Sequence, residues 1–198
     1  KEEGPSCCST CYQNFERISE EHCPRCFRDG KSDLCKDCKK WEKEGNLVQH
    51  QSIFTYNQAM KEYFSQYKFQ GDYALRFVFA KAAKKAVKMF REHTIVPIPV
   101  SVEKFQVRGF NQVQGILDAG KVAYSNILEK KDTLAQSSKT REERLQTQQV
   151  FKIKIEVDLP DKILLVDDIY TTGKTLQLAK QILLEAGVKE VLSFSVAR

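Results

Sequence analysis

The segment KILLVDDIYTTGKT (residues 162–175) decides which fold the sequence predicts. The apolar run at 163–166 is typical of a central strand in a parallel sheet that is buried on both faces. After Gly173, apolar residues recur at helical spacing as far as Ala186, and Gly187 follows as a stop signal. The segment therefore predicts a buried strand, then a loop rich in threonine, then a helix.

The loop between this strand and this helix carries groups that suit a phosphorylated sugar. A helix N-terminus presents unpaired N–H groups and about half a positive charge, so it attracts a phosphate. The loop continues with Thr171, Thr172, Gly173, Lys174 and Thr175. The threonine hydroxyl groups can donate hydrogen bonds to a phosphate, and the glycine lets the backbone come close to it. Asp167 and Asp168 would repel a phosphate, but they suit sugar hydroxyls or Mg²⁺.

Two other nucleotide-binding motifs do not fit the spacing. A P-loop needs a glycine five positions before Gly173, where Asp168 stands. A Rossmann fingerprint needs G-x-G-x-x-G, which the sequence lacks. The remaining alternative is a strand that merely ends in two solvated aspartates.

Length and composition indicate a soluble, globular protein. The chain has 198 residues, of which 41% are hydrophobic and 29% charged, enough for one full core and a small added module. No apolar run approaches the roughly 20 residues of a membrane span, and no signal peptide is visible. Because the sequence does not begin with methionine, we expect a trimmed start, which leaves targeting at a lost N-terminus open. The net charge of +6 fits either a polyanion-binding surface or a solvated basic one.

All seven cysteines lie within the first 38 residues, and six form C-x-x-C pairs. Such pairs at short separation predict structural zinc sites in a reducing compartment. We expect residues 1–45 to form a zinc-ribbon module and residues 46–198 to form the main domain. The favoured zinc site consists of Cys23, Cys26, Cys35 and Cys38, which leaves Cys8 and Cys11 as half of a second site and Cys7 as a bystander. The competing assignment is one site made of Cys8, Cys11, Cys23 and Cys26.

Further strands are predicted at 48–56, 94–99, 149–155 and 191–196, and helices at 57–69, at 73–90 and from the N-cap Asn111 through 122. Pro97 and Pro99 are expected to mark the end of their strand.

Aromatic residues at 56–69 are interleaved with Lys61 and Lys68, which suits core packing or the stacking of single-stranded bases. The outer face of the helix at 73–90 carries Lys81, Lys84, Lys85 and Lys88, which are either solvated or contact a DNA backbone.

The polar segment 128–150 is too long for an ordinary loop in a compact domain and is typical of a lid or a disordered segment. Its cations Lys139, Arg141 and Arg144 suit closure over an anionic ligand, and equally they suit a solvated surface.

Segment 162–175 closely resembles the phosphoribosyl pyrophosphate (PRPP) loop of type I phosphoribosyltransferases, in which four apolar residues, two acidic residues and T-T/S-G-x-T follow one another. The resemblance implies an α/β fold with a parallel sheet. It also implies that Asp167 and Asp168 bind the ribose hydroxyls of PRPP with Mg²⁺, and that residues 171–175 wrap the 5′-phosphate. Pro99, Val100 and Ser101 would form the pyrophosphate loop, and Arg108 would approach the same anion.

Motifs along the whole chain narrow this resemblance to the ComF/ComFC late-competence proteins of bacteria. They are the C-x-x-C module, YNQAMK (56–61), YKFQGD (67–72), VPIP (96–99), RGFNQ (108–112) and DDIYTTG (167–173). Relatives of this type carry a further C-x-x-C pair near the N-terminus, so the ligation of Cys8 and Cys11 stays open. The resemblance implies a role in natural transformation, in which the protein handles single-stranded DNA on the cytoplasmic side of the membrane. The helicase-like ATPase ComFA is the implied partner.

Three functional hypotheses follow, because the resemblance supplies no defined phosphoribosyl acceptor. The first is a competence protein in which PRPP binding assists DNA handling with weak or no turnover. The second is an active phosphoribosyltransferase, in which Mg²⁺, Arg108 and the basic lid stabilise the transition state. The third is a DNA-binding adaptor with a vestigial pocket.

Overall fold

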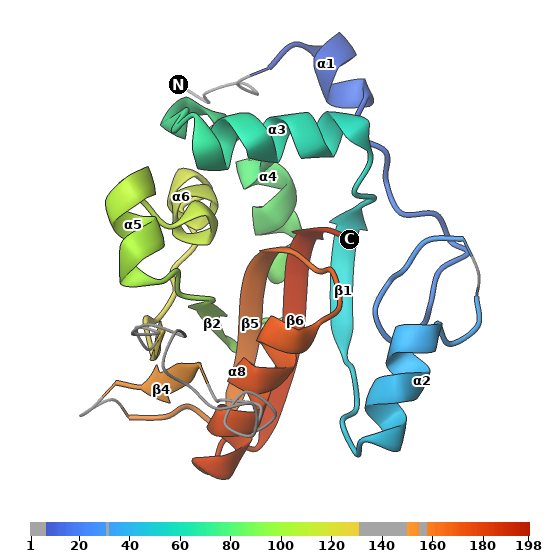
Figure 1. Cartoon of the computed structure of the whole chain (residues 1–198), viewed down its shortest axis with the longest axis vertical. Helices are drawn as coiled ribbons and strands as arrows, with labels where there is room; N and C mark the ends of the chain where they lie inside the picture. The colour runs from blue at the N-terminus through green and yellow to red at the C-terminus, as the bar shows by residue number, and fades with distance from the viewer. Residues whose placement is uncertain (1–6, 31, 131–149, 155–157) are drawn as a thin grey trace, which may run out of the picture.

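A sheet of four parallel strands forms the centre of the computed structural model, which describes residues 7–30, 32–130, 150–154 and 158–198 (Figure 1). The strands lie in the order β1 (His50–Phe54), β6 (Glu190–Ala197), β5 (Lys162–Ile169) and β2 (Thr94–Pro97). The prediction of an α/β fold with a parallel sheet is confirmed. Strand β5 is paired on both sides, which explains why its apolar run is continuous.

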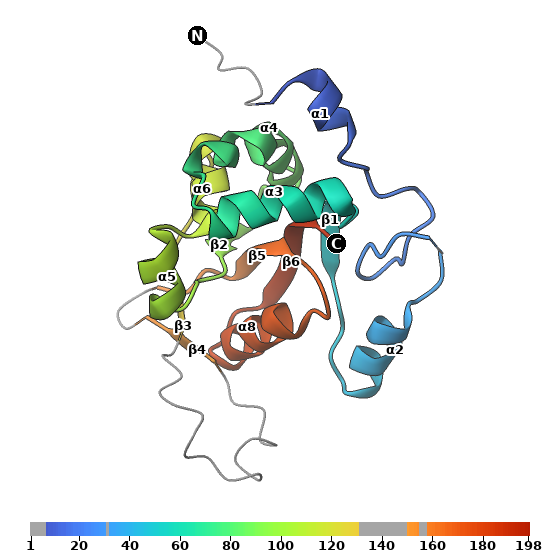
Figure 2. The ribbon, with the colours of Figure 1, turned by 45° about the horizontal axis from the view of Figure 1, so that its top comes forward.

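Side chains of β5 alternate between two hydrophobic cores. Ile163 and Leu165 pack with α8 (Lys174–Glu185) on one face of the sheet. Leu164 and Val166 pack on the other face with the helices α3 (Gln58–Phe69), α4 (Arg76–Val87) and α6 (Gln112–Ala119). Figure 2 shows α8 on one side of the strands and these three helices on the other. The sheet is therefore the middle layer of three.

Capping side chains fix where several helices begin. Asn57 accepts a hydrogen bond from the backbone of Met60 at the start of α3, and Asn111 accepts two at the start of α6, as the sequence predicted. Several boundaries differ from the prediction, and one is the end of α4, which lies at Val87 rather than at residue 90. The helix predicted at 73–90 begins as a 3₁₀ turn, η1 (Tyr73–Leu75), because the side chain of Asp72 caps that turn, and α4 follows it. The helix from Asn111 ends at Ala119, before Gly120.

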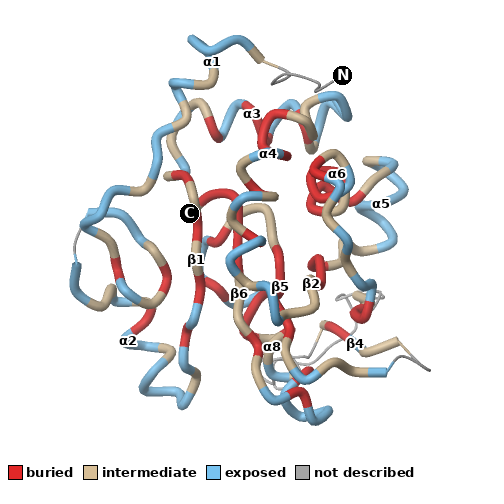
Figure 3. Tube along the Cα trace, turned by 180° about the vertical axis from the view of Figure 1, so that it is seen from behind, coloured by how far each residue is buried: buried red, intermediate tan, exposed pale blue. Residues whose placement is uncertain are grey.

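A short helix, α5 (Val102–Arg108), follows β2 and was not predicted. It buries no residue, and its apolar side chains Val102, Phe105 and Val107 are exposed, so its seven residues lack the longer core-facing stripe that reveals a helix in a sequence. Ser101 caps its start, and Gly109, with φ 78°, ends it. Figure 3 shows how the exposed residues of α5 contrast with the buried residues of the sheet and of α6.

The cysteine-rich segment lies along the free edge of β1, with α1 (Ser9–Gln13) at one end and α2 (Lys36–Lys43) at the other (Figure 1). The backbone of Ile18 donates to Ile53, and Thr55 donates to Glu16, so the segment covers the edge that β1 would otherwise expose. The backbone of His50 also donates to Arg25. The segment is thus hydrogen-bonded to the sheet along most of β1.

Two further strands, β3 (Leu128–Lys130) and β4 (Phe151–Ile153), pair antiparallel beside the main sheet. They frame most of the segment that was predicted to be a lid. The lid residues Lys139, Arg141 and Arg144 lie outside the described residues. Among the described residues, no helix is both long and apolar enough to cross a bilayer.

Candidate functional site

The two predicted phosphate loops meet at one edge of the sheet. Strand β2 runs parallel to β5, with Pro97 beside Val166, and the backbone of Ile98 donates to Val166 over 2.8 Å. Because the strands are parallel and adjacent, the residues after Pro97 and those after Val166 emerge at the same carboxyl edge. Ligands of open α/β sheets bind at such edges.

Asp167 and Asp168 stand at the end of β5, and the environment of Asp167 disfavours its charge. Burial, together with the adjacent charge of Asp168, raises the pKa of Asp167 to about 7. The backbone N–H of Asp168 donates to Asp167 Oδ1 over 2.9 Å and opposes the shift. Both acids also border a small void of about 10 Å³ with largely apolar walls. Without a cation, Asp167 is therefore readily protonated near neutral pH.

Lys68, from α3, is the partner of Asp168. Its Nζ lies 2.6 Å from Asp168 Oδ2 and 4.6 Å from the centre of the Phe64 ring. Both side chains of this salt bridge are 14% exposed. The salt bridge was not predicted, since no local pattern links Lys68 to an acid far along the chain. The ammonium group neutralises one of the two acids and will compete with any cation that approaches Asp168.

The loop after β5 exposes the residues that were predicted to bind phosphate. Thr171, Thr172, Lys174 and Thr175 are exposed, and α8 begins after the buried Gly173. Gly173, the N-cap residue of α8, has no side chain that could cap the helix, and Thr172 Oγ1 accepts from the backbone of Lys174, the first residue of α8, over 3.4 Å. The N-cap residues of α3, α5 and α6 cap their helices with a side chain, whereas α8, like α2 and α4, has no such cap, so the N–H groups of its first turn suit an anion.

Glycine is required at position 173 for two independent reasons. Its φ of 80° lies in the left-handed region. A Cβ added there would lie 2.1 Å from the hydroxyl oxygen of Tyr170. The loop is thus pressed against the buried ring of Tyr170.

The predicted pyrophosphate residues Pro99, Val100 and Ser101 lie at the edge that β2 shares with β5. The hydroxyl oxygen of Ser101 accepts from the Lys104 backbone over 3.4 Å, so this residue also begins α5. Arg108 lies in the last turn of α5, where its guanidinium stands 5.3 Å from the centre of the Phe69 ring. The role of Arg108 on pyrophosphate stays a prediction.

A hollow of about 760 Å³ adjoins Pro99 and Val100, and its far wall carries Lys130, Lys152 and Lys154 from the β3–β4 region. Burial lowers the pKa of Lys130, with a further decrease from Lys104 and an opposing effect of Asp167. Lys152 is paired with Glu129 over 2.7 Å. The hollow is therefore basic and close to the acidic end of β5. This hollow was not predicted, because β3 and β4 lie at the two ends of segment 128–150 and no local pattern pairs them.

Four cysteines form the candidate metal centre. The Sγ atoms of Cys23, Cys26, Cys35 and Cys38 all lie within 4.8 Å of one another. The distance is 3.8 Å between Cys23 and Cys38 and 3.5 Å between Cys26 and Cys35. Four ligands at about 2.3 Å from a tetrahedral zinc ion stand about 3.8 Å apart, whereas a disulfide requires about 2.0 Å. The set therefore fits a structural zinc ion, which it could hold with all four positions closed.

Hydrogen bonds to sulfur also favour a metal at this centre. Burial opposes the ionisation of Cys23, but backbone N–H groups, led by that of Cys35, outweigh it and lower its pKa to about 7. Burial raises the pKa of Cys26 to about 12. Four thiolates can thus coexist here only with a cation among them. Cys8 and Cys11 are exposed near α1 and do not join this group, so the competing set does not assemble in the described part of the chain.

Comparison with known proteins gives two relatives that match over 96% of this chain. Competence protein ComFC of Streptococcus pneumoniae (strain ATCC BAA-255 / R6) is 51% identical over 191 residues, which cover 87% of that protein. Competence protein ComFC of Bacillus subtilis (strain 168) is 34% identical over 201 residues, which cover 83% of it. No family model matches the chain. The similarity extends over the cysteine-rich segment as well as the sheet.

Replacing Asp167 by asparagine is expected to stabilise the ligand-free protein at alkaline pH. The pKa of Asp167 is about 7 in the folded protein against an ordinary value of 3.8, so the folded state binds the extra proton between these values. The wild type therefore loses stability as pH rises from 4 to 7, by about 4 kcal/mol at most, since one pKa unit corresponds to about 1.4 kcal/mol. Asp167→Asn should lack this loss and still accept the Asp168 N–H.

Urea unfolding at several pH values between 4.5 and 8.5 measures the effect. The exposed Asp33→Asn serves as the matched control and should follow the wild type. If the free energy of unfolding changed with pH in the same way in the wild type and in Asp167→Asn, the raised pKa of Asp167 would be contradicted.

The purified chain is expected to hold one zinc ion, and Cys38→Ala should abolish tight binding, because a four-thiolate site cannot lose a ligand without opening. Cys11→Ser should leave the content near one ion per chain. Metal analysis and zinc release to a colorimetric chelator provide the measurement. Loss of zinc from Cys11→Ser, with retention by Cys38→Ala, would refute the assignment.

Proposed function

This chain belongs to the ComFC family of competence proteins, and on that premise we propose that it binds PRPP with Mg²⁺ at the loop after β5 while it assists the handling of single-stranded DNA in natural transformation. The observation that carries the PRPP part is the N-terminus of α8, which a short loop, residues 170–173, connects to the acidic end of β5. A phosphate suits the first of these features and ribose hydroxyls suit the second.

The distribution of charge around the loop matches the two ends of PRPP. The 5′-phosphate would bind the backbone of residues 171–175, of which all but Gly173 are exposed, and the ribose would lie over Asp167 and Asp168. The pyrophosphate group would then extend toward Pro99 and the basic hollow lined by Lys130. Mg²⁺ would compensate the negative charge that burial makes unfavourable at Asp167, so PRPP with Mg²⁺ would bring the positive charge that this carboxylate lacks in the free protein.

The outer face of α4 supports the proposal of DNA binding. Lys81, Lys85 and Lys88 are exposed on this helix, while Val78 and Phe79 are buried in the core. Such a row of cations can contact successive phosphates of a flexible strand without reading its sequence. We propose that this surface works with the helicase-like ATPase ComFA, which the family resemblance implies as partner.

A second candidate function is phosphoribosyl transfer to an acceptor. The observation that favours it is the size of the hollow beside Pro99, since about 760 Å³ exceeds what a pyrophosphate group alone would fill. Cleavage would break the bond from C1 of PRPP to the pyrophosphate oxygen, and the acceptor would donate the electron pair that forms the new bond to C1. Release of pyrophosphate in the presence of nucleobases distinguishes this function from binding alone.

PRPP with Mg²⁺ is expected to raise the melting temperature of the wild type by about 5–10 °C at a hundredfold excess over its Kd. The double variant Asp167→Asn/Asp168→Asn should show no shift, because it cannot hold the cation and accepts the ribose hydroxyls less well. Ribose 5-phosphate, which lacks pyrophosphate, should give a smaller shift. Equal shifts for wild type and double variant would refute the site. No shift in either would leave the adaptor hypothesis as the better account.

Removing three cations from α4 should weaken the binding of single-stranded DNA and reduce its dependence on salt. Each phosphate contact contributes about 0.7 to the slope of log K against log salt, so Lys81→Ala/Lys85→Ala/Lys88→Ala should lower the slope by about 2. Fluorescence anisotropy with a labelled oligonucleotide provides the measurement. A matched triple variant on α2, Lys39→Ala/Lys40→Ala/Lys43→Ala, changes the net charge equally and should bind as the wild type does. Equal losses in both would rule out a specific role of α4.

A further inference from the structure

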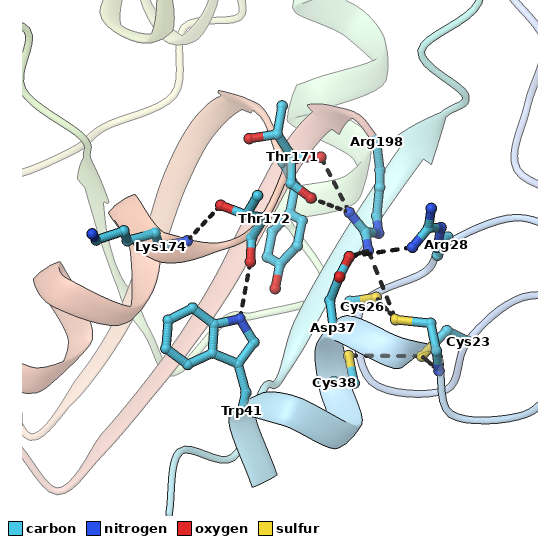
Figure 4. Close-up of polar contacts among 12 residues, drawn as sticks. Cys23, Cys26, Arg28, Asp37, Cys38, Trp41, Thr171, Thr172, Lys174 and Arg198 are labelled. Atoms are coloured by element: carbon cyan, nitrogen blue, oxygen red, sulfur yellow. Dashed lines mark hydrogen bonds and ion pairs between the residues drawn. The ribbon is translucent and has the colours of Figure 1, made fainter. Parts of the chain in front are cut away.

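The cysteine-rich segment touches the candidate phosphate loop through a buried arginine. Arg198 follows β6, and its side chain is 5% exposed between the loop and the cysteine cluster (Figure 4). Its Nη1 donates to the carbonyl oxygen of Thr171 over 2.8 Å and to that of Tyr170 over 3.3 Å. On the other side, its Nη2 lies 3.8 Å from Asp37 Oδ2 and 4.0 Å from Cys35 Sγ. One guanidinium thus joins the loop to the metal centre.

Trp41 forms a second link to the same loop. This residue lies on α2, one turn after Cys38, and its indole Nε1 donates to the carbonyl oxygen of Thr172 over 2.9 Å (Figure 4). Its ring also packs against the core cluster that contains Leu176 of α8. Two consecutive carbonyl groups of the loop, at Thr171 and Thr172, are therefore held from the side of the cysteines.

Holding these carbonyls orients the amides that would bind an anion. In a trans peptide, the C=O of one residue and the N–H of the next point in opposite directions. With the carbonyls of Thr171 and Thr172 directed at Arg198 and Trp41, the N–H groups of Thr172 and Gly173 point away from the cysteine-rich segment. Arg198 also lies 4.4 Å from the centre of the Tyr170 ring, which His50 contacts from a centroid distance of 4.2 Å. The loop thus has little freedom to turn its peptide planes.

The cysteine cluster in turn fixes both links. Helix α2 begins directly after Cys35 and contains Cys38, so two of the four cysteines lie at its start. Asp37 stands between them, contacts Arg198, and accepts from Arg28 over 3.2 Å. A zinc ion on the four sulfur atoms would hold the first turn of α2, and through it Trp41 and Asp37, in this arrangement.

We propose that Trp41 and Arg198 are positioning residues through which the cysteine cluster holds the loop at 170–173 in its anion-binding shape, so that PRPP affinity depends on zinc. The inference rests on the proposed function for its ligand, but the link between cluster and loop exists without one. It assigns the cysteine-rich segment a task beyond its own folding, because its metal sets the geometry of a site that contains no cysteine.

Trp41→Phe tests the link with little change in packing, because it keeps an aromatic ring and removes the indole N–H. The variant should bind PRPP with Mg²⁺ roughly five- to tenfold more weakly by titration calorimetry, the loss expected for one hydrogen bond. Tyr12→Phe, which removes a polar group from an aromatic residue in the same segment, should bind as the wild type does. Removal of zinc by a chelator should weaken binding at least as much as Trp41→Phe.

A measurement without ligand separates this inference from the proposed function. Hydrogen exchange of the Tyr170 and Gln177 amides, which donate to the carbonyl oxygens of Ala197 and Gly173, should be faster in Trp41→Phe and in the zinc-free protein than in the wild type, while β5 stays protected. Trp41 is the one tryptophan of the chain, so its emission should shift to longer wavelength when zinc is removed.

If the wild type does not bind PRPP, the proposed function fails, and the exchange rates alone decide on the link. Unchanged exchange of the Tyr170 and Gln177 amides after Trp41→Phe and after chelation would overturn the inference, whatever the affinity for PRPP.

Discussion

The parallel pairing of β2 with β5 is the constraint on which the candidate site depends. It sets Pro97 beside Val166, and the bond from Ile98 to Val166 extends the ladder to the edge of the sheet. Two loops far apart in the sequence consequently emerge side by side, one before α5 and one before α8. A shift of one residue would turn the apolar side chains of β5 to the wrong cores, so burial on both faces specifies this register strongly.

The edge is built from groups that do not stabilise the free protein. Burial and the charge of Asp168 disfavour the ionisation of Asp167, and among the described residues Lys68, from another layer, compensates the charge of Asp168. The N-terminus of α8 lacks the side-chain cap that α3, α5 and α6 possess. Each feature lowers stability without a ligand, and each would be compensated by a cation, a sugar or a phosphate. Such a coincidence at one edge is typical of a binding site rather than of an ordinary loop.

Much of this architecture could be predicted from short stretches of sequence. The run at 163–166 predicted β5, the position of Asn111 predicted the start of α6, and cysteine spacing favoured the four residues that the structure brings together. These features are local, so periodicity, capping and spacing reveal them. The contacts of Lys68 with Asp168 and of Trp41 with Thr172 were not predicted, because they join residues from different layers. Helix α5 was not predicted, because its seven residues are too few to show a repeated apolar stripe.

The position of Arg198 shows why the cysteine-rich segment and the sheet are better understood together. Cys23, Cys26 and Cys38 share a hydrophobic cluster with Ile163 and Leu165 of β5, so the cysteine-rich segment and the sheet have part of their core in common. A guanidinium buried at this boundary needs partners on both sides, and it finds Asp37 on one and the loop carbonyls on the other. Moving the segment away would leave this charge without Asp37 and the carbonyl of Thr172 without Trp41. Separating the cysteine-rich segment from the sheet would therefore destabilise the loop that is proposed to bind the ligand.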